Sequence, residues 1–188
     1  MIITSFNIPG LGGSSKQISL KRLFVVVHPD IILIQETMSE AYKACHFFLK
    51  IFPGWEVCAT DVSGRSGGLL CIWNPSSCDF VSYYSRARIM LVGRIKGIEE
   101  EVKILNVYGP YGDQELFWKN IVGSGLLQDR NLILGGDLNF TLSPSEVWGS
   151  KHGDPQFAFF SFIFQNVCLI DVYLVQLGPT WSNGRVGQ

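Results

Sequence analysis

Residues 132–139 read Leu-Ile-Leu-Gly-Gly-Asp-Leu-Asn, an apolar run that passes through two glycines into an acid and an amide. A short apolar run of this kind is typical of a strand that is buried on both faces. Two further runs end in the same manner: residues 2–6 precede Asn7, and residues 31–35 precede Glu36. Because α/β folds bind ligands at the rim where such strands end, the runs predict a layered α/β fold with a polar site there.

The rest of the chain alternates between strand-like and helix-like segments, with no repeat and no linker. Helices are expected after the loop of residues 10–15 as far as Pro29, and over residues 39–51, 114–121 and 156–167. Strands are expected over residues 2–7, 31–35, 55–61, 69–73, 80–84, 89–95, 102–108, 131–134 and 169–174. Ser14 or Ser15 is expected to cap the first helix. The apolar positions expected on one side of a helix are Leu20, Leu23, Phe24 and Val27 in the first helix, and Tyr42, Cys45, Phe48 and Leu49 in the second.

Composition excludes several classes of protein. The chain has 188 residues, 47% of them hydrophobic and 16% charged, which is ample for the core of one domain and rules out disorder. Its net charge of −1 excludes a protein that coats the DNA backbone by charge alone, although a nuclease can meet phosphate through a metal. The longest apolar stretch, residues 157–164, is too short to span a bilayer, and no secretory signal is visible. Five cysteines without a CxxC pair indicate reduced thiols in an intracellular protein.

The polar residues at the strand ends suit metal chemistry. Glu36 and Asp137 could together bind a hard divalent cation, since Mg²⁺ typically takes one or two carboxylates and keeps several waters. Asn7 and Asn139 are neutral groups suited to orienting a phosphate or a water. Each of these residues by itself is typical of a turn or a cap, and only their conjunction points to a site.

The conjunction resembles a known family. The motifs that carry the resemblance are Ser5-Phe6-Asn7-Ile8-Pro9-Gly10-Leu11, Pro29-Asp30-Ile31 with Gln35-Glu36-Thr37, Asn106-Val107-Tyr108-Gly109-Pro110, and Gly135-Gly136-Asp137-Leu138-Asn139. In this order they are similar to the endonuclease/exonuclease/phosphatase superfamily. The segments 64–70, 169–171 and 180–183 resemble in particular the apurinic-type endonuclease domain of plant non-LTR (LINE-type) retrotransposons. The resemblance covers essentially the whole chain.

The resemblance implies a four-layer α/β sandwich of the DNase I-like type, formed by residues 1–188 as one domain. It also implies cleavage of DNA phosphodiesters that depends on Mg²⁺ or Mn²⁺. Glu36 would be the principal metal ligand, with Asn7 beside it, and Asp137 would orient or deprotonate the attacking water. Tyr108 would sit near the scissile phosphate, and Asn139 would help to hold it. DNA is the implied partner, and no membrane or obligate protein partner is expected.

A glycine-rich loop could add a DNA contact. Arg65 and Ser66 lie in the stretch Gly-Arg-Ser-Gly-Gly at residues 64–68, where Arg65 could meet a phosphate beside main-chain N–H groups. The alternative is a hairpin turn with a solvated arginine. Trp181 is expected to pack at the edge of the core.

Members of the family continue into an Arg-Leu-Asp strand and a Ser-Asp-His motif, and this chain stops before both. The resemblance therefore implies a domain that lacks its C-terminal strands, with weak or no activity, since His28, His46 and His152 do not match the motif. Three alternatives stay open: a phosphatase of the same superfamily, a catalytically dead nucleic-acid-binding module, and a non-functional remnant. Action in the nucleus is expected of a retrotransposon endonuclease.

Overall fold

The computed structural model describes residues 1–63, 66–85, 87–142 and 156–172. The chain forms two compact units. The first unit comprises Met1–Gly109 and Arg130–Leu138, and it holds all strands of the described residues together with two helices. The second unit comprises Pro110–Asp129 and Asn139–Gln188, and its described part is helical.

The first unit contains two four-stranded sheets with similar pairing. The strands of the first sheet are, in spatial order, β1 (Ile3–Asn7), β2 (Ile31–Gln35), β6 (Leu70–Trp73) and β3 (Glu56–Ala59). Those of the second are β10 (Leu132–Asp137), β9 (Val102–Tyr108), β8 (Arg88–Ile95) and β7 (Cys78–Ser85). In each sheet an outer parallel pair, β1–β2 or β10–β9, is followed by antiparallel strands. A small hairpin of β4 (Val62–Ser63) and β5 (Ser66–Gly67) stands apart.

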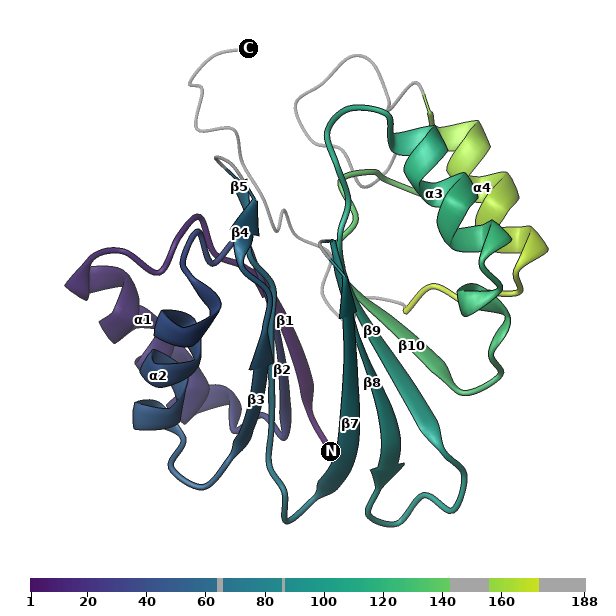
Figure 1. The fold of residues 1–188 in the computed structure, drawn as a ribbon. Helices are drawn as coiled ribbons and strands as arrows, with labels where there is room; N and C mark the ends of the chain where they lie inside the picture. The colour runs from purple at the N-terminus through teal and green to yellow at the C-terminus, as the bar shows by residue number, and fades with distance from the viewer. Residues whose placement is uncertain (64–65, 86, 143–155, 173–188) are drawn as a thin grey trace. The chain divides into compact units, whose positions relative to one another are not determined.

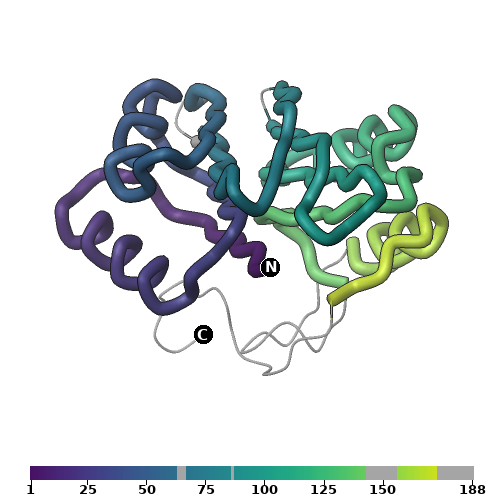
Figure 2. Tube along the Cα trace, turned by 90° about the horizontal axis from the view of Figure 1, so that it is seen from below, coloured from purple at the N-terminus to yellow at the C-terminus, as the bar shows by residue number. Residues whose placement is uncertain are grey.

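Strand β2 is the centre of the packing, because all five of its residues are buried. Ile31 and Leu33 face the second sheet and join one apolar cluster with residues of β8 and β9. Ile32 and Ile34 point to the opposite face and join a second cluster with Phe24. That second cluster includes side chains of α1 (Ser14–Val27) and α2 (Ala41–Ile51), which cover the outer face of the first sheet (Figures 1 and 2). The alternation follows from the two-residue period of a strand.

The second unit is built around an aromatic cluster. Its helices are α3 (Gln114–Gly123), the short 3₁₀ turn η1 (Leu126–Gln128) and α4 (Phe157–Asn166). Trp118 of α3 is fully buried and makes ring contacts with Phe140, Phe160 and Phe164 (Figure 1 shows α3 beside α4). Phe162 is 66% exposed, so α4 combines core residues with exposed apolar surface.

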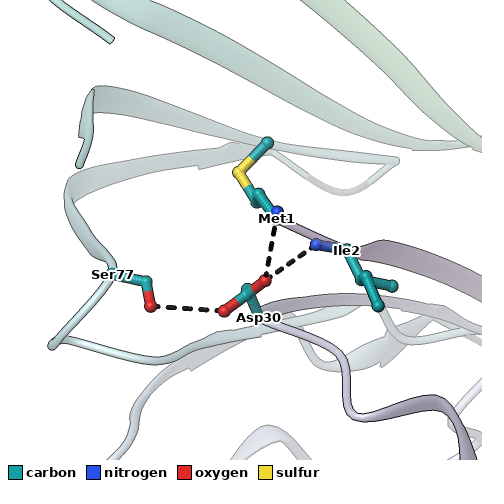
Figure 3. A network of polar contacts seen from close by, with 4 residues as sticks. All are labelled: Met1, Ile2, Asp30 and Ser77. Atoms are coloured by element: carbon teal, nitrogen blue, oxygen red, sulfur yellow. Dashed lines mark hydrogen bonds and ion pairs between the residues drawn. The ribbon is translucent and has the colours of Figure 1, made fainter. Parts of the chain in front are cut away.

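Asp30 ties together three chain segments at the end of β1 and β2 that lies away from Asn7 and Glu36. Its carboxylate accepts hydrogen bonds from the Ile2 main-chain N–H at 2.7 Å and from the Ser77 hydroxyl at 3.2 Å (Figure 3). The Met1 main-chain nitrogen lies 3.9 Å from the same carboxylate. The Asp30 main-chain oxygen accepts a further bond from the Asn74 N–H at 2.9 Å. The start of each strand is thereby held to the turn between β6 and β7.

All five cysteines are free thiols. Cys58, Cys71 and Cys78 lie in the apolar cluster between the sheets. Burial raises the pKa of the Cys71 thiol well above its usual value, and burial together with the nearby negative charge of Asp30 raises the pKa of Cys78 to about 11. Both thiols are therefore neutral at physiological pH.

The two sheets and four helices are those of the predicted DNase I-like α/β fold. The structure differs from the prediction in several details. Helix α1 begins at Ser14 with Gly13 as its N-cap, so neither Ser14 nor Ser15 caps it. Strand β10 extends through Asp137 instead of ending at Leu134, because it pairs with β9 as far as Tyr108.

Two further predictions of burial and strand structure were wrong. On α2 the buried residues are Ala44 and Phe48, whereas Tyr42 is 68% exposed, because the face toward the sheet is rotated from the one expected. No strand forms over residues 169–172, where Ile170 is 87% exposed. An apolar alternation makes a strand only where a neighbouring strand can accept its hydrogen bonds. Among the described residues, no helix has the length and apolarity that crossing a membrane requires.

Replacing Phe48 with alanine tests the helix-covered core. Phe48 is fully buried between α2 and the sheet, so Phe48→Ala is expected to lower the free energy of unfolding by about 3–5 kcal/mol. Tyr42→Ala on the exposed side of the same helix is the control, with an expected change within about 0.5 kcal/mol. Urea unfolding followed by circular dichroism measures both, and equal losses would contradict the assigned helix face.

Candidate active site

Four polar residues meet where the parallel strands of both sheets end. Asn7 is the last residue of β1, and Glu36 directly follows β2. Tyr108 and Asp137 are the last residues of β9 and β10 and are register partners. Asn7 is likewise the partner of Gln35, the residue before Glu36. Each parallel pair therefore delivers two side chains to the same rim.

Two hydrogen bonds join these residues across the sheets. The Asn7 side-chain amide donates to Oδ2 of Asp137 at 2.5 Å, linking β1 to β10. The Tyr108 hydroxyl donates to Oε1 of Glu36, linking β9 to the end of β2. Together with the two strand pairings, these bonds close a ring of four residues, here called the rim ring. The structure thus brings together four of the predicted site residues, Asn7, Glu36, Tyr108 and Asp137.

Glu36 adopts a backbone conformation that is uncommon for its residue type. Its φ of 54° lies in the left-handed region, which costs an L-residue about 1–2 kcal/mol. Main-chain bonds on both sides hold it there, from the Gly10 N–H to the Glu36 oxygen at 2.9 Å and from the Thr37 N–H to the Gly68 oxygen at 3.0 Å. Its side chain is 91% buried, with 9% of its surface exposed. Strain of this kind is typical of functional sites.

Glycines make room for the rim ring. At Gly136 φ is 126°, and an added Cβ would lie 1.9 Å from the main-chain oxygen of Val107. At Gly135 an added Cβ would lie 2.7 Å from Cδ1 of Leu33 on the opposing sheet. The glycine pair before Asp137 therefore permits both the positive φ at Gly136 and the close approach of β10 to the opposing sheet.

The donor set of the ring fits a hard divalent cation. Oδ1 of Asn7 is buried and has no hydrogen-bond partner among the described residues. Such an atom close to carboxylates suits a metal ligand, because a buried oxygen otherwise needs a donor. The described residues contain no cluster of three or more His, Cys, Asp or Glu side chains able to hold a metal. The ring thus offers Glu36 and Asp137 with amide oxygen, a set that suits Mg²⁺ or Mn²⁺ with bound water.

The rim ring does not include the other predicted site residues. Asn139 belongs to the second unit, where its main-chain oxygen accepts a hydrogen bond from the Gln114 side chain at 2.6 Å and its φ is 55°. Arg65, the Ser66 side chain, His152 and Trp181 lie outside the described residues. His28 ends α1 and His46 is exposed on α2, so neither belongs to the ring.

Sequence reasoning gave no role to two buried amides beneath the ring. Gln35 is 1% exposed and Asn106 is fully buried, and the two side chains hydrogen-bond to each other at 2.7 Å. The signal that could have found Asn106 is a polar residue within the apolar run of residues 104–107. A buried polar side chain needs partners, so such an interruption predicts a structured contact.

The two packed sheets form an α/β fold of the DNase I-like type. A model of the endonuclease/exonuclease/phosphatase family matches residues 4–183, and the chain belongs to that family. No curated protein sequence matches it.

Solved structures show the same fold. The endonuclease domain of TRAS1, a telomere-specific non-LTR retrotransposon, is 17% identical with a TM-score of 0.60, over 87% of this chain and 70% of that one. The 3′-5′ exonuclease NExo from Neisseria meningitidis is 18% identical with a TM-score of 0.60, over 89% and 71%. The AP endonuclease LMAP from Leishmania major is 13% identical with a TM-score of 0.64, over 87% and 65%.

Gly136→Ala tests the steric need for a glycine before Asp137. Its Cβ would meet the main chain of Val107, so Gly136→Ala is expected to lower the free energy of unfolding by about 3 kcal/mol. Gly97→Ala is the control, because Gly97 also has a positive φ (87°) but nothing lies within 4 Å of an added Cβ. Its expected loss is about 1 kcal/mol. Similar losses in urea unfolding would show that backbone conformation alone matters.

Proposed function

We propose that this chain is a divalent-metal-dependent DNA endonuclease domain of the retrotransposon type. The observation that carries the proposal is the rim ring, in which two carboxylates, an amide and a phenol from both sheets converge at the strand ends. Glu36 and Asn7 would hold Mg²⁺ or Mn²⁺. The similarity to the endonuclease domain of TRAS1 supports the retrotransposon assignment, which would place the action in the nucleus.

The ring residues divide the reaction between them. Bound there, a divalent cation would polarise the phosphoryl oxygen and offset its developing charge. Asp137, oriented by the Asn7 amide, aligns the attacking water and accepts its proton. Tyr108 donates to Glu36 and so fixes the direction of that carboxylate beside the phosphate. Asn139 helps to hold the phosphate. Arg65 and Ser66 of the glycine-rich loop would contact the DNA backbone.

Removing the charge of Asp137 tests this assignment. Asp137→Asn keeps the shape but cannot accept the proton of water, so nicking of supercoiled plasmid in Mg²⁺ is expected to slow by about 10²- to 10⁴-fold. The rate is compared with that of the wild-type chain and with an EDTA blank.

Asp79→Asn is the matched control, since Asp79 is an exposed acid on β7 and is expected to keep the wild-type rate. Nicking by Asp137→Asn at the control rate would refute the role of Asp137. Metal binding by the wild-type chain without any nicking would favour the binding-module alternative. A 3′-phosphorylated oligonucleotide tested in parallel identifies phosphatase activity.

Tyr108→Phe isolates the hydrogen bond to Glu36. Loss of the phenolic donor leaves the carboxylate less well oriented, and Mn²⁺ affinity is expected to fall about tenfold. Mn²⁺ titration followed by electron paramagnetic resonance measures the affinity directly. Tyr83→Phe, at a 60% exposed tyrosine of β7, should bind Mn²⁺ as the wild type does. Unchanged affinity in Tyr108→Phe would remove Tyr108 from the metal site.

A further inference from the structure

Asn106 is a polar side chain at the centre of the apolar interface between the sheets. It lies on β9 and is fully buried. Ile104 and Tyr108, two residues to either side of it, pack against the apolar cluster between the sheets. Because side chains two apart share one face of a strand, Asn106 also faces the first sheet.

The Asn106 carboxamide both donates and accepts hydrogen bonds, and its partners in these bonds lie across the interface on β2 and β6. Nδ2 donates to the main-chain oxygen of Ile34 at 3.2 Å and to that of Leu70 at 3.1 Å. Oδ1 accepts from Nε2 of Gln35 at 2.7 Å, and Gln35 donates in turn to the Ser5 hydroxyl at 3.2 Å. One side chain of β9 is therefore bound to β2 and β6 directly and to β1 through Gln35.

The contacts lie one layer beneath the rim ring. Ile34 and Gln35 immediately precede Glu36, and Asn106 precedes Tyr108 by two residues on the same face. Gln35 is also the register partner of Asn7. Asn106 thus joins β2 to β9 just before the ends of the two strands. At those ends Glu36, which follows β2, and Tyr108, the last residue of β9, hydrogen-bond to each other. A shift of β2 against β9 would separate that pair.

We propose that Asn106 is a positioning residue that fixes the end of β2 against β9 and so sets the geometry of Glu36 as a metal ligand. The proposal rests on the proposed function for the part that concerns the metal. Apolar packing alone lets two sheets slide, since it is non-directional. Three directional bonds from one side chain define a single register, and residues that orient ligands typically contribute 10- to 100-fold to metal affinity.

The test compares Asn106→Leu with Ile104→Ala in the full chain. Ile104 is fully buried on the same strand and face but makes only apolar contacts in the core, so it reports loss of packing alone. Urea midpoints establish how much global stability each variant loses. Mn²⁺ binding followed by electron paramagnetic resonance is expected to weaken at least about tenfold in Asn106→Leu and by less than about twofold in Ile104→Ala.

Amide hydrogen exchange gives a readout independent of the metal. The N–H groups of Gly10 and Thr37 hold the backbone around Glu36, and their protection is expected to fall in Asn106→Leu by more than the loss of global stability explains. Ile104→Ala should lower their protection only in step with global stability. Asn106→Ser, which keeps a small polar group, replaces Asn106→Leu if that variant does not fold, with the same expected direction.

The proposal would be overturned if the Asn106 variant and Ile104→Ala, compared at equal stability, had the same Mn²⁺ affinity and the same amide protection at Gly10 and Thr37. A wild-type chain that binds no Mn²⁺ would refute the proposed function instead. The exchange data would then still decide whether Asn106 positions the Glu36 backbone.

Discussion

The burial of β2 on both faces is the constraint on which the rest of the structure depends. A strand between a second sheet and two helices has no solvated face, so Ile31 to Ile34 must be apolar at every position. Polar side chains fit only at the end of β2, and the two residues at that end, Gln35 and Glu36, are both polar. The polar side chains of this segment are therefore confined to the rim by the same packing that stabilises the core.

Most of the first unit could be predicted from the sequence because short local patterns of residues mark its strands. Apolar runs with abrupt polar ends gave β1, β2 and β10, and the converging residues followed from the rule that parallel strands share a rim. The orientation of α2 could not be predicted so readily. Its apolar residues, including Tyr42 and Leu49, cover more than one face, and only the tertiary contact of Phe48 decides which side is buried. The strand expected over residues 169–174 did not form in its described part, since strand pairing is a long-range property.

The site shows the same division between local and long-range information. Glu36 and Asp137 are visible in the sequence as acids at strand ends. That Tyr108 donates to Glu36 and Asn7 to Asp137 depends on the two sheets meeting face to face, which no periodicity reports. The left-handed backbone of Glu36 is hidden as well, because nothing about a glutamate marks it for that conformation. Backbone strain is a feature that only the folded structure reveals, and here it lies at the candidate metal ligand itself.

Because Gly135 has no side chain, it allows β10 to lie close to Leu33 of the opposing sheet. Sheets packed face to face commonly lie about 10 Å apart, a gap that two layers of side chains fill. Where Gly135 opposes Leu33, one of those layers is missing, so the main chain of β10 lies close to the Leu33 side chain. A methyl group at Gly135 would push β10 away from Leu33 and so separate Asp137 from the Asn7 amide. All four residues of the rim ring would still be present in the chain. The proposed active site depends on the distances between its residues, so one added carbon at Gly135 could disrupt it while all four ring residues remain.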